Sequence, residues 1–293
     1  MKIRPDLAVV ASTVLWGTIW IPIRQLNSVG WAQGLATTVS CILATIVLFG
    51  FLSYKRRLSK ISEARLWFLG LLMGFGIALY FEAMVRGNVA RVVLLFYLMP
   101  VWSAILGRVI NGNAITVRRI SGIFLGISGM GVVFYEGSGF PLPSSVADFM
   151  ALISGIAWAF AFTLLDRSKV STSTSGLIFT TLALMGPFFY MLTLVPGSRV
   201  SLAVSGFGSG VFGGEAWLIA LAFIWLLPAV LLTLFGASRL QPGQASIFLM
   251  LEVAISLVSA AFLIDEPFGM REMLGATLII SASFTEFGGF RQK

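Results

Sequence analysis

Residues 98–101, Leu-Met-Pro-Val, are matched 152 positions later by residues 250–253, Met-Leu-Glu-Val. A second pair has a similar spacing, because Ser-Thr-Val-Leu-Trp-Gly at 12–17 is matched by Ser-Gly-Ile-Ala-Trp-Ala at 154–159. Gly122 and Gly275 follow the first pair at corresponding places. Tryptophan, glycine and the stretch around Pro100 therefore have counterparts in the same order in the second half, and the sequence predicts an internal repeat.

The composition around these landmarks is typical of a membrane protein. Of 293 residues, 58% are hydrophobic and 11% are charged, and the mean hydropathy is +0.95. Soluble domains are about 45–50% apolar and about 25% charged, so an ordinary soluble enzyme is excluded. The +8 charge is divided among short basic clusters between apolar runs, which argues against nucleic acid as a partner. With no histidine and only Cys41, we expect no metal, no cofactor and no intrachain disulfide.

A membrane-crossing helix needs about 20 mostly apolar residues. Ten such segments are predicted: Leu7–Leu26, Ala32–Leu52, Leu66–Met84, Val89–Ile110, Ile120–Tyr135, Ala147–Leu165, Gly176–Val195, Ala216–Leu234, Gln244–Ile264 and Met273–Phe290. The fold class expected is therefore an all-α, multi-pass integral membrane protein with ten transmembrane helices.

The basic residues predict the orientation of these helices. Fifteen of the 20 Lys and Arg residues precede the first segment or follow an even-numbered one, and five lie in the other connections. Because cytoplasmic loops carry the excess of Lys and Arg, both termini are expected in the cytoplasm. The short loops and the absence of a cleavage site after the first segment favour a cell (inner) membrane.

The repeat divides the chain into residues 1–135 and 147–293, joined by a linker at 136–146. Each unit holds five helices, and an odd number forces the second unit to insert upside down. Inverted repeats place a substrate site near the midplane, at the interface between the repeats, and rocking of one repeat against the other gives alternating access.

These landmarks resemble a known family. Trp-Gly at 16–17, Leu-Met-Pro-Val-Trp at 98–102 and Leu-Glu at 251–252 followed by Asp-Glu at 265–266 are similar to the two EamA domains of the drug/metabolite transporter superfamily. Within it the chain is most similar to ten-helix exporters of amino acids and metabolites, including the YddG-type exporters of aromatic amino acids. Val253 stands where these proteins often carry proline, so we expect no kink there.

Glu252 lies about eight residues into the ninth apolar segment. An ionised carboxylate inside a membrane costs several kcal/mol unless it is paired or hydrated. Either it binds a substrate ammonium or exchanges protons, or it is a structural carboxyl that hydrogen-bonds to Ser246 or Ser256. Glu82 lies near the basic residues at 86 and 91, so a local ion pair is expected there.

Aromatic residues deep in the segments form the second candidate constellation. Trp158 and Phe162 are spaced i, i+4 and share one helix face, and Trp16 with Trp20 repeats the spacing in the first half. Aromatic faces suit apolar or aromatic side chains and organic cations, although each ring could equally face lipid. The predicted substrate-binding residues are Tyr80, Tyr97, Trp102, Trp158, Phe162, Ser246, Met250 and Glu252.

The expected function is secondary export of small amphipathic metabolites, chiefly amino acids including aromatic ones. Its partners are the substrate, the lipid bilayer and, where transport is coupled, protons. One alternative is a proton-coupled exporter of drugs or quaternary cations, in which Glu252 pairs with the cation. The other is a membrane-embedded enzyme, which the lack of histidine and of a paired-acid metal motif disfavours.

Overall fold

A computed structural model describes residues 4–57, 61–134, 143–167, 173–194, 213–264 and 268–287. Its helices are α1 (Pro5–Thr18), α2 (Trp20–Ser28), α3 (Gln33–Tyr54), α4 (Ala64–Arg86), α5 (Val89–Phe96), α6 (Met99–Asn111), α7 (Val117–Phe134), α8 (Val146–Arg167), α9 (Thr174–Thr193), α10 (Gly214–Ala220), the π-helical turn η2 (Leu221–Leu226), α11 (Leu227–Ala237), α12 (Pro242–Leu249), α13 (Leu251–Ile264) and α14 (Met270–Glu286). Much of the linker at 136–146 and the acidic pair at 265–266 lie outside the described residues.

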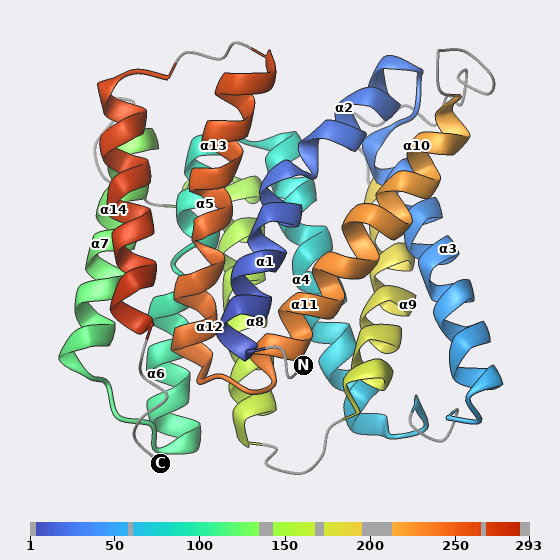
Figure 1. Cartoon of the computed structure of the whole chain (residues 1–293), viewed down its shortest axis with the longest axis horizontal. Coiled ribbons are helices and arrows are strands. Elements are labelled where there is room, and N and C mark those ends of the chain that lie inside the picture. Colours follow the sequence, from blue (N-terminus) through green and yellow to red (C-terminus); the bar gives the residue numbers. More distant parts are fainter. Residues whose placement is uncertain are drawn as a thin grey trace.

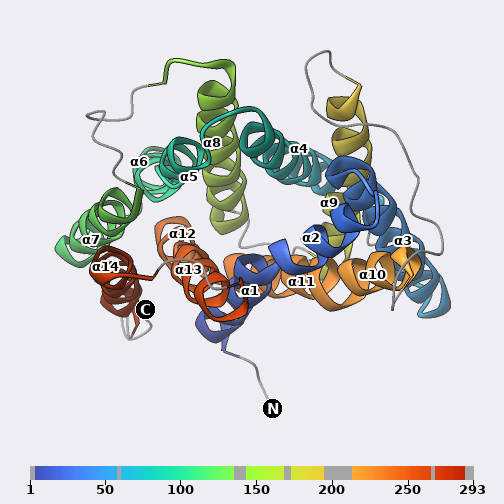
Figure 2. The same cartoon turned by 90° about the horizontal axis from the view of Figure 1, so that it is seen from above.

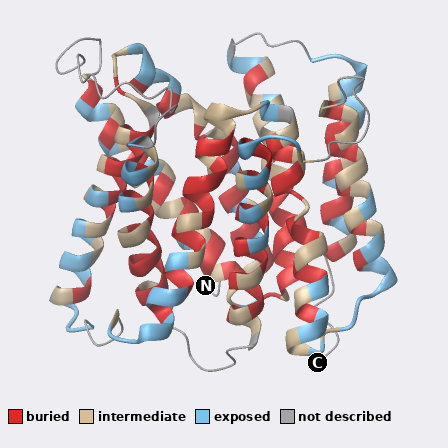
Figure 3. Cartoon of the chain, turned by 180° about the vertical axis from the view of Figure 1, so that it is seen from behind, coloured by how far each residue is buried: buried red, intermediate tan, exposed pale blue. Residues whose placement is uncertain are grey.

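Nine described segments are long and apolar enough to cross a membrane, and they correspond to the first nine predicted spans. The tenth predicted span corresponds to α14, whose described part is 17 residues long. Apolar side chains such as Ile46, Phe124 and Phe284 are exposed. Figure 3 shows exposed residues along the outer helices of the bundle. Exposed apolar side chains are unfavourable in water but not against lipid tails, so this pattern suits a lipid environment.

Three of the nine spans are interrupted within their length. The first breaks between α1 and α2 at Ile19, the fourth between α5 and α6 at residues 97–98, and the ninth between α12 and α13 at Met250. Pro100 in the first turn of α6 lacks a backbone N–H and so suits a helix start. The ninth span contains no proline at Val253, yet its helix is interrupted at Met250, where the backbone N–H bonds to the Ile247 carbonyl in a tighter turn.

The first helix of each half packs among helices of the other half. α1 lies against α11 and α13, whereas α8 lies against α4, α5 and α6. Figure 2 shows the view down the bundle, with α7 and α14 paired at one side and α3, α9 and α10 gathered at the other. The two halves are therefore interleaved around the middle of the molecule.

Glycines allow the closest of these contacts. A Cβ at Gly129 of α7 would lie 2.7 Å from the Gly275 carbonyl oxygen of α14, and a Cβ at Gly275 would lie 2.7 Å from the Gly129 carbonyl oxygen. Gly70 of α4 similarly meets the backbone of Thr180 in α9. These small residues serve packing within the chain.

The two ends of the bundle differ in charge. The start of α1, the α3–α4, α6–α7 and α11–α12 connections and the end of α14 lie at the lower end in Figure 1. The α2–α3 and α4–α5 connections lie at the upper end. The described residues at the lower end include Arg56 and Arg57 in the α3–α4 connection, Arg65 in the first turn of α4 and Arg118 in the first turn of α7. At that end Arg119 Nε also donates a buried hydrogen bond of 3.2 Å to Glu286 Oε1.

Candidate functional site

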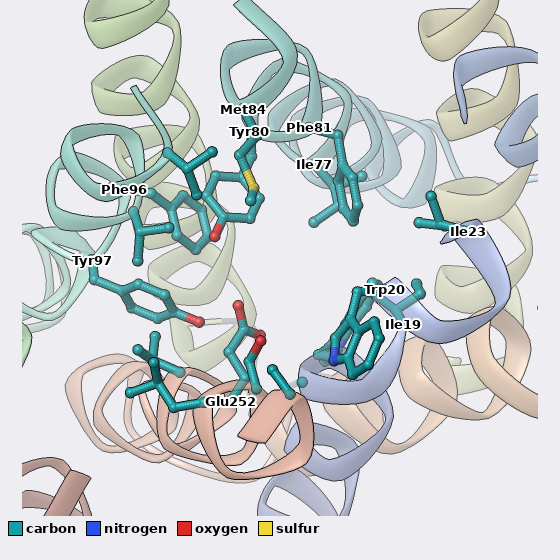
Figure 4. Close-up of a pocket in the computed structure, with 18 of the residues that line it drawn as sticks. Ile19, Trp20, Ile23, Ile77, Tyr80, Phe81, Met84, Phe96, Tyr97 and Glu252 are labelled. Carbon is teal, nitrogen blue, oxygen red and sulfur yellow. The ribbon is translucent and has the colours of Figure 1, made fainter. Parts of the chain in front are cut away.

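A cavity of about 640 Å³ lies between the two halves, where the interrupted helices meet. Side chains of α1, α2, α4, α5 and α13 form most of its wall, and α8 contributes Trp158. Figure 4 shows Tyr80, Phe81 and Phe96 on one side of the space, with Glu252 and Trp20 on the opposite side. The breaks in the spans therefore border this cavity between the repeats.

Aromatic rings dominate the wall next to α4 and α5. Tyr80 stacks on Phe96, with ring centroids 4.2 Å apart, and Phe96 meets Tyr97 edge to face at 4.9 Å. The α5–α6 break places Tyr97 directly after the last helical residue of α5, so that its ring turns towards α13. Such rings offer faces to apolar, aromatic or cationic groups of a ligand.

The cavity indoles already have partners for their polar N–H groups. Trp16 Nε1 donates to Thr233 Oγ1 at 3.0 Å, Trp20 Nε1 to Ser259 Oγ at 3.1 Å, and Trp158 Nε1 to the Met73 carbonyl at 3.2 Å. These bonds fix the rings and leave mainly their apolar faces for a ligand. Gly76 makes room for one of them, because a Cβ there would lie 2.6 Å from Trp158 Cδ1.

Glu252 is the acidic residue of the cavity wall. It lies in the first turn of α13, where the helix dipole stabilises a negative charge. The Tyr97 hydroxyl points towards its carboxyl (Figure 4). None of the ion pairs among the described residues includes Glu252. Its charge is therefore not neutralised by a described Lys or Arg, and a cationic ligand group can take that place.

The cavity is closed below and reaches solvent above. At its floor Tyr97 and Leu249 are buried, and the Tyr97 hydroxyl donates to the Leu249 carbonyl at 3.2 Å. The wall residues Arg24 and Asn27 of α2, at the upper end, are exposed. A ligand therefore enters this conformation from the upper end.

Four of the eight predicted residues, Tyr80, Tyr97, Trp158 and Glu252, line the cavity. The other four lie outside its wall. Phe162 is buried behind Trp158, at 5.4 Å edge to face, and Ser246 hydrogen-bonds to Ser103 of α6 at 2.7 Å. Met250 packs against Gly126 of α7, and Trp102 is half-buried against the core. The predicted ion pair of Glu82 is confirmed, with Arg86 Nε at 2.7 Å.

Several wall residues were not among the predicted site residues. Trp16 and Trp20 line the cavity, and their i, i+4 spacing, which matches that of Trp158 and Phe162, is the signal for them in the sequence. Phe96 and Arg24 carried no such signal, because neither belongs to a repeated landmark. Within the described residues no group of three or more Cys, Asp or Glu side chains could hold a metal ion.

Comparisons with known proteins agree over nearly the whole chain. The model of the EamA-like transporter family matches it twice, at residues 3–135 and 145–285. The chain is 26% identical over 276 residues to the uncharacterized transporter YyaM of Bacillus subtilis (strain 168), covering 90% of this chain and 85% of that protein. It is 23% identical over 305 residues to the uncharacterized transporter YvbV of the same strain, covering 96% and 90%. A solved structure, described only as a crystal structure of a protein, has a TM-score of 0.76 at 15% identity and covers 97% of both chains, which shows a shared fold.

Proposed function

The chain belongs to the EamA-like transporter family, and we propose that it is a secondary exporter of small amphipathic metabolites, chiefly amino acids and among them aromatic ones. The family implies a small-molecule substrate and a surrounding bilayer. We place the protein in the cell (inner) membrane, where an exporter of cytoplasmic metabolites acts.

The observation that carries this proposal is the combination of a single carboxylate with aromatic faces in one cavity. Glu252 supplies the negative charge for a substrate ammonium group, and Tyr80, Phe96 and Trp158 supply the surface for an apolar side chain. The cavity volume of about 640 Å³ is in the range of small-molecule sites, roughly 300–1,000 Å³.

The proposed topology has ten membrane-crossing helices, with α14 as the tenth and both termini in the cytoplasm. It is supported by the basic lower end of the bundle and by the alternation of helix ends between the two sides (Figure 1). With the lower end in the cytoplasm, the cavity opens to the outside. The conformation is then the outward-facing state of an alternating-access cycle.

The proposed units of the pseudo-symmetric fold are the inverted repeats at residues 1–135 and 147–293. Two observations support them besides the double match of the family model. The break between α5 and α6 and the break between α12 and α13 lie at equivalent positions in the two halves. The contacts of Gly129 and Gly275 are also reciprocal, as expected of residues related by a pseudo-two-fold axis.

A proton-coupled exporter of quaternary cations is the second candidate. It is favoured by the position of Glu252 opposite stacked rings, since ring faces attract cations (Figure 4). Proton binding to the carboxyl would then compete with the cation. A membrane-embedded enzyme, by contrast, gains no support from a match to a transporter family.

Uptake into liposomes that hold the purified protein separates these candidates. Radiolabelled phenylalanine, threonine, methionine and a quaternary cation are compared with and without a pH gradient. We expect saturable phenylalanine flux without a gradient, and weaker flux of threonine. Gradient-dependent flux of the cation alone would replace the proposal by the second candidate, and flux of neither class would contradict both.

A further inference from the structure

Two polar side chains from one helix face line the upper part of the cavity. Arg24 and Asn27 are three residues apart in α2, so they project from the same face of the helix. Ile23, their neighbour, is visible at the cavity edge in Figure 4. Arg24 is the one basic residue of the described cavity wall, as Glu252 is the one acidic residue.

The arginines at the upper end differ in their partners. Arg86 donates to Glu82 at 2.7 Å, and Arg91 lies 3.5 Å from Asp148. Arg24 forms neither an ion pair nor a side-chain hydrogen bond with the residues that the structure describes. Arg271, at the upper start of α14, donates to the Val132 carbonyl at 2.7 Å. Structural partners therefore account for these three arginines, whereas the charge of Arg24 is available to a ligand in the cavity.

The contact between α1 and α13 fixes the depth of Glu252 in the cavity, and α2 carries Arg24 above it. A Cβ at Gly17 would lie 2.7 Å from the carbonyl oxygen of Glu252, so these two residues are at the same depth. Arg24 follows Gly17 by seven residues, beyond the α1–α2 break at Ile19, and lies in α2 at the upper end of the bundle (Figure 1). The two side chains thus project into one space from different depths, with the basic group nearer the solvent.

We infer that Arg24 and Asn27 form a carboxylate subsite, which makes the cavity selective for zwitterions over simple amines. A guanidinium binds a carboxylate through two parallel hydrogen bonds, and the Asn27 amide adds a third donor. The substrate ammonium lies towards Glu252 and its carboxylate towards the opening. This inference rests on the proposed amino-acid transport and adds to it the group that recognises the acid end of the substrate.

The test compares phenylalanine with phenethylamine, which has the same ring and amine but no carboxylate. In proteoliposomes, Arg24→Gln is expected to raise the KM for phenylalanine about tenfold, as the loss of a charge-assisted hydrogen bond would. The KM for phenethylamine should stay within twofold, and Arg24→Lys should retain part of the affinity for phenylalanine.

A charge-relocation variant separates direct binding from general attraction by a basic entrance. Gln25 is exposed and does not line the cavity, so Arg24→Gln combined with Gln25→Arg keeps the charge at the upper end but moves it off the cavity face. We expect this variant to behave like Arg24→Gln alone. Recovery of phenylalanine transport would overturn the inference in favour of long-range attraction.

The remaining outcomes distinguish the inference from the function on which it rests. If the unaltered protein transports phenylalanine and Arg24→Gln changes both compounds equally or not at all, the carboxylate subsite is refuted while amino-acid transport stands. If the unaltered protein transports phenethylamine but not phenylalanine, the proposed function itself fails.

Discussion

Replacing Glu252 by glutamine should weaken the binding of phenylalanine without altering the shape of the cavity. The two side chains have nearly the same volume, so the wall around Tyr97 and Gly17 is kept while the negative charge is lost. A hydrogen bond to a charged group such as the Glu252 carboxylate contributes about 1.5–3 kcal/mol to binding, and a typical hydrogen bond such as one to a glutamine amide contributes about 0.5–1.5 kcal/mol. The difference of about 1–2 kcal/mol corresponds to a roughly 5- to 30-fold rise in Kd.

The assay is equilibrium binding of radiolabelled phenylalanine to purified protein, with the elution profile on size exclusion as the check on folding. Glu215→Gln is the matched control, because Glu215 is exposed in α10 and does not line the cavity. We expect the control to bind phenylalanine as the unaltered protein does. A Kd for Glu252→Gln within twofold of the unaltered protein would refute the assignment of this carboxyl to the substrate ammonium.

Three further predictions concern pH and packing. If protons compete with the substrate at Glu252, the affinity for phenylalanine falls as the pH is lowered, because protonation removes the carboxylate charge. Phenylalanine binding by Glu252→Gln should then not depend on pH, and an unchanged pH profile in this variant would show that another group titrates. Gly129→Ala should lower the melting temperature in detergent, since overpacking costs about 1–3 kcal/mol; Gly131→Ala on the same helix, with nothing within 4 Å of its Cβ position, should not. Thr233→Val leaves the buried indole N–H of Trp16 without its acceptor, at a cost of about 1–3 kcal/mol, whereas Thr233→Ser should keep most of the stability, which thermal unfolding can compare.

The membrane spans were predictable from sequence because hydropathy over about 20 residues is a property of composition, not of packing. The first nine predicted spans match described helices. The break at Met250 was not predictable in the same way. It occurs without proline, through a tightened turn in which the Met250 N–H bonds to the Ile247 carbonyl, and no residue type in the sequence marks it.

The sequence predicted how deep in the membrane the site residues lie, but only partly which of them point into the cavity. Tyr97 and Glu252 lie at or next to helix breaks, and both line the cavity. Ser246 and Met250 lie close to Glu252 in sequence, yet they are spaced i, i+4 and face α6 and α7 instead. Which face of a helix points into the cavity depends on how the helix is rotated about its own axis. A membrane helix that is apolar on all sides gives no sequence pattern from which this rotation can be predicted.

The pairs Trp16–Trp20 and Trp158–Phe162 have the same spacing, but a helix break in one half gives them different surroundings. In the second half, α8 continues as one helix through Phe162, which is buried behind Trp158. In the first half the chain breaks at Ile19, and Trp20 beyond the break lines the cavity together with Trp16. The same spacing therefore has different outcomes in the two halves.

Substrate protection of a cysteine placed in the cavity tests the central claim most directly. Cys41 is buried, so a Cys41→Ser background leaves Ser256→Cys, on the cavity wall, as the one accessible thiol. In intact cells a membrane-impermeant maleimide should label this thiol from outside, and phenylalanine should slow the labelling in proportion to its occupancy. Labelling at the same rate with saturating phenylalanine would contradict the account that this cavity holds the transported substrate.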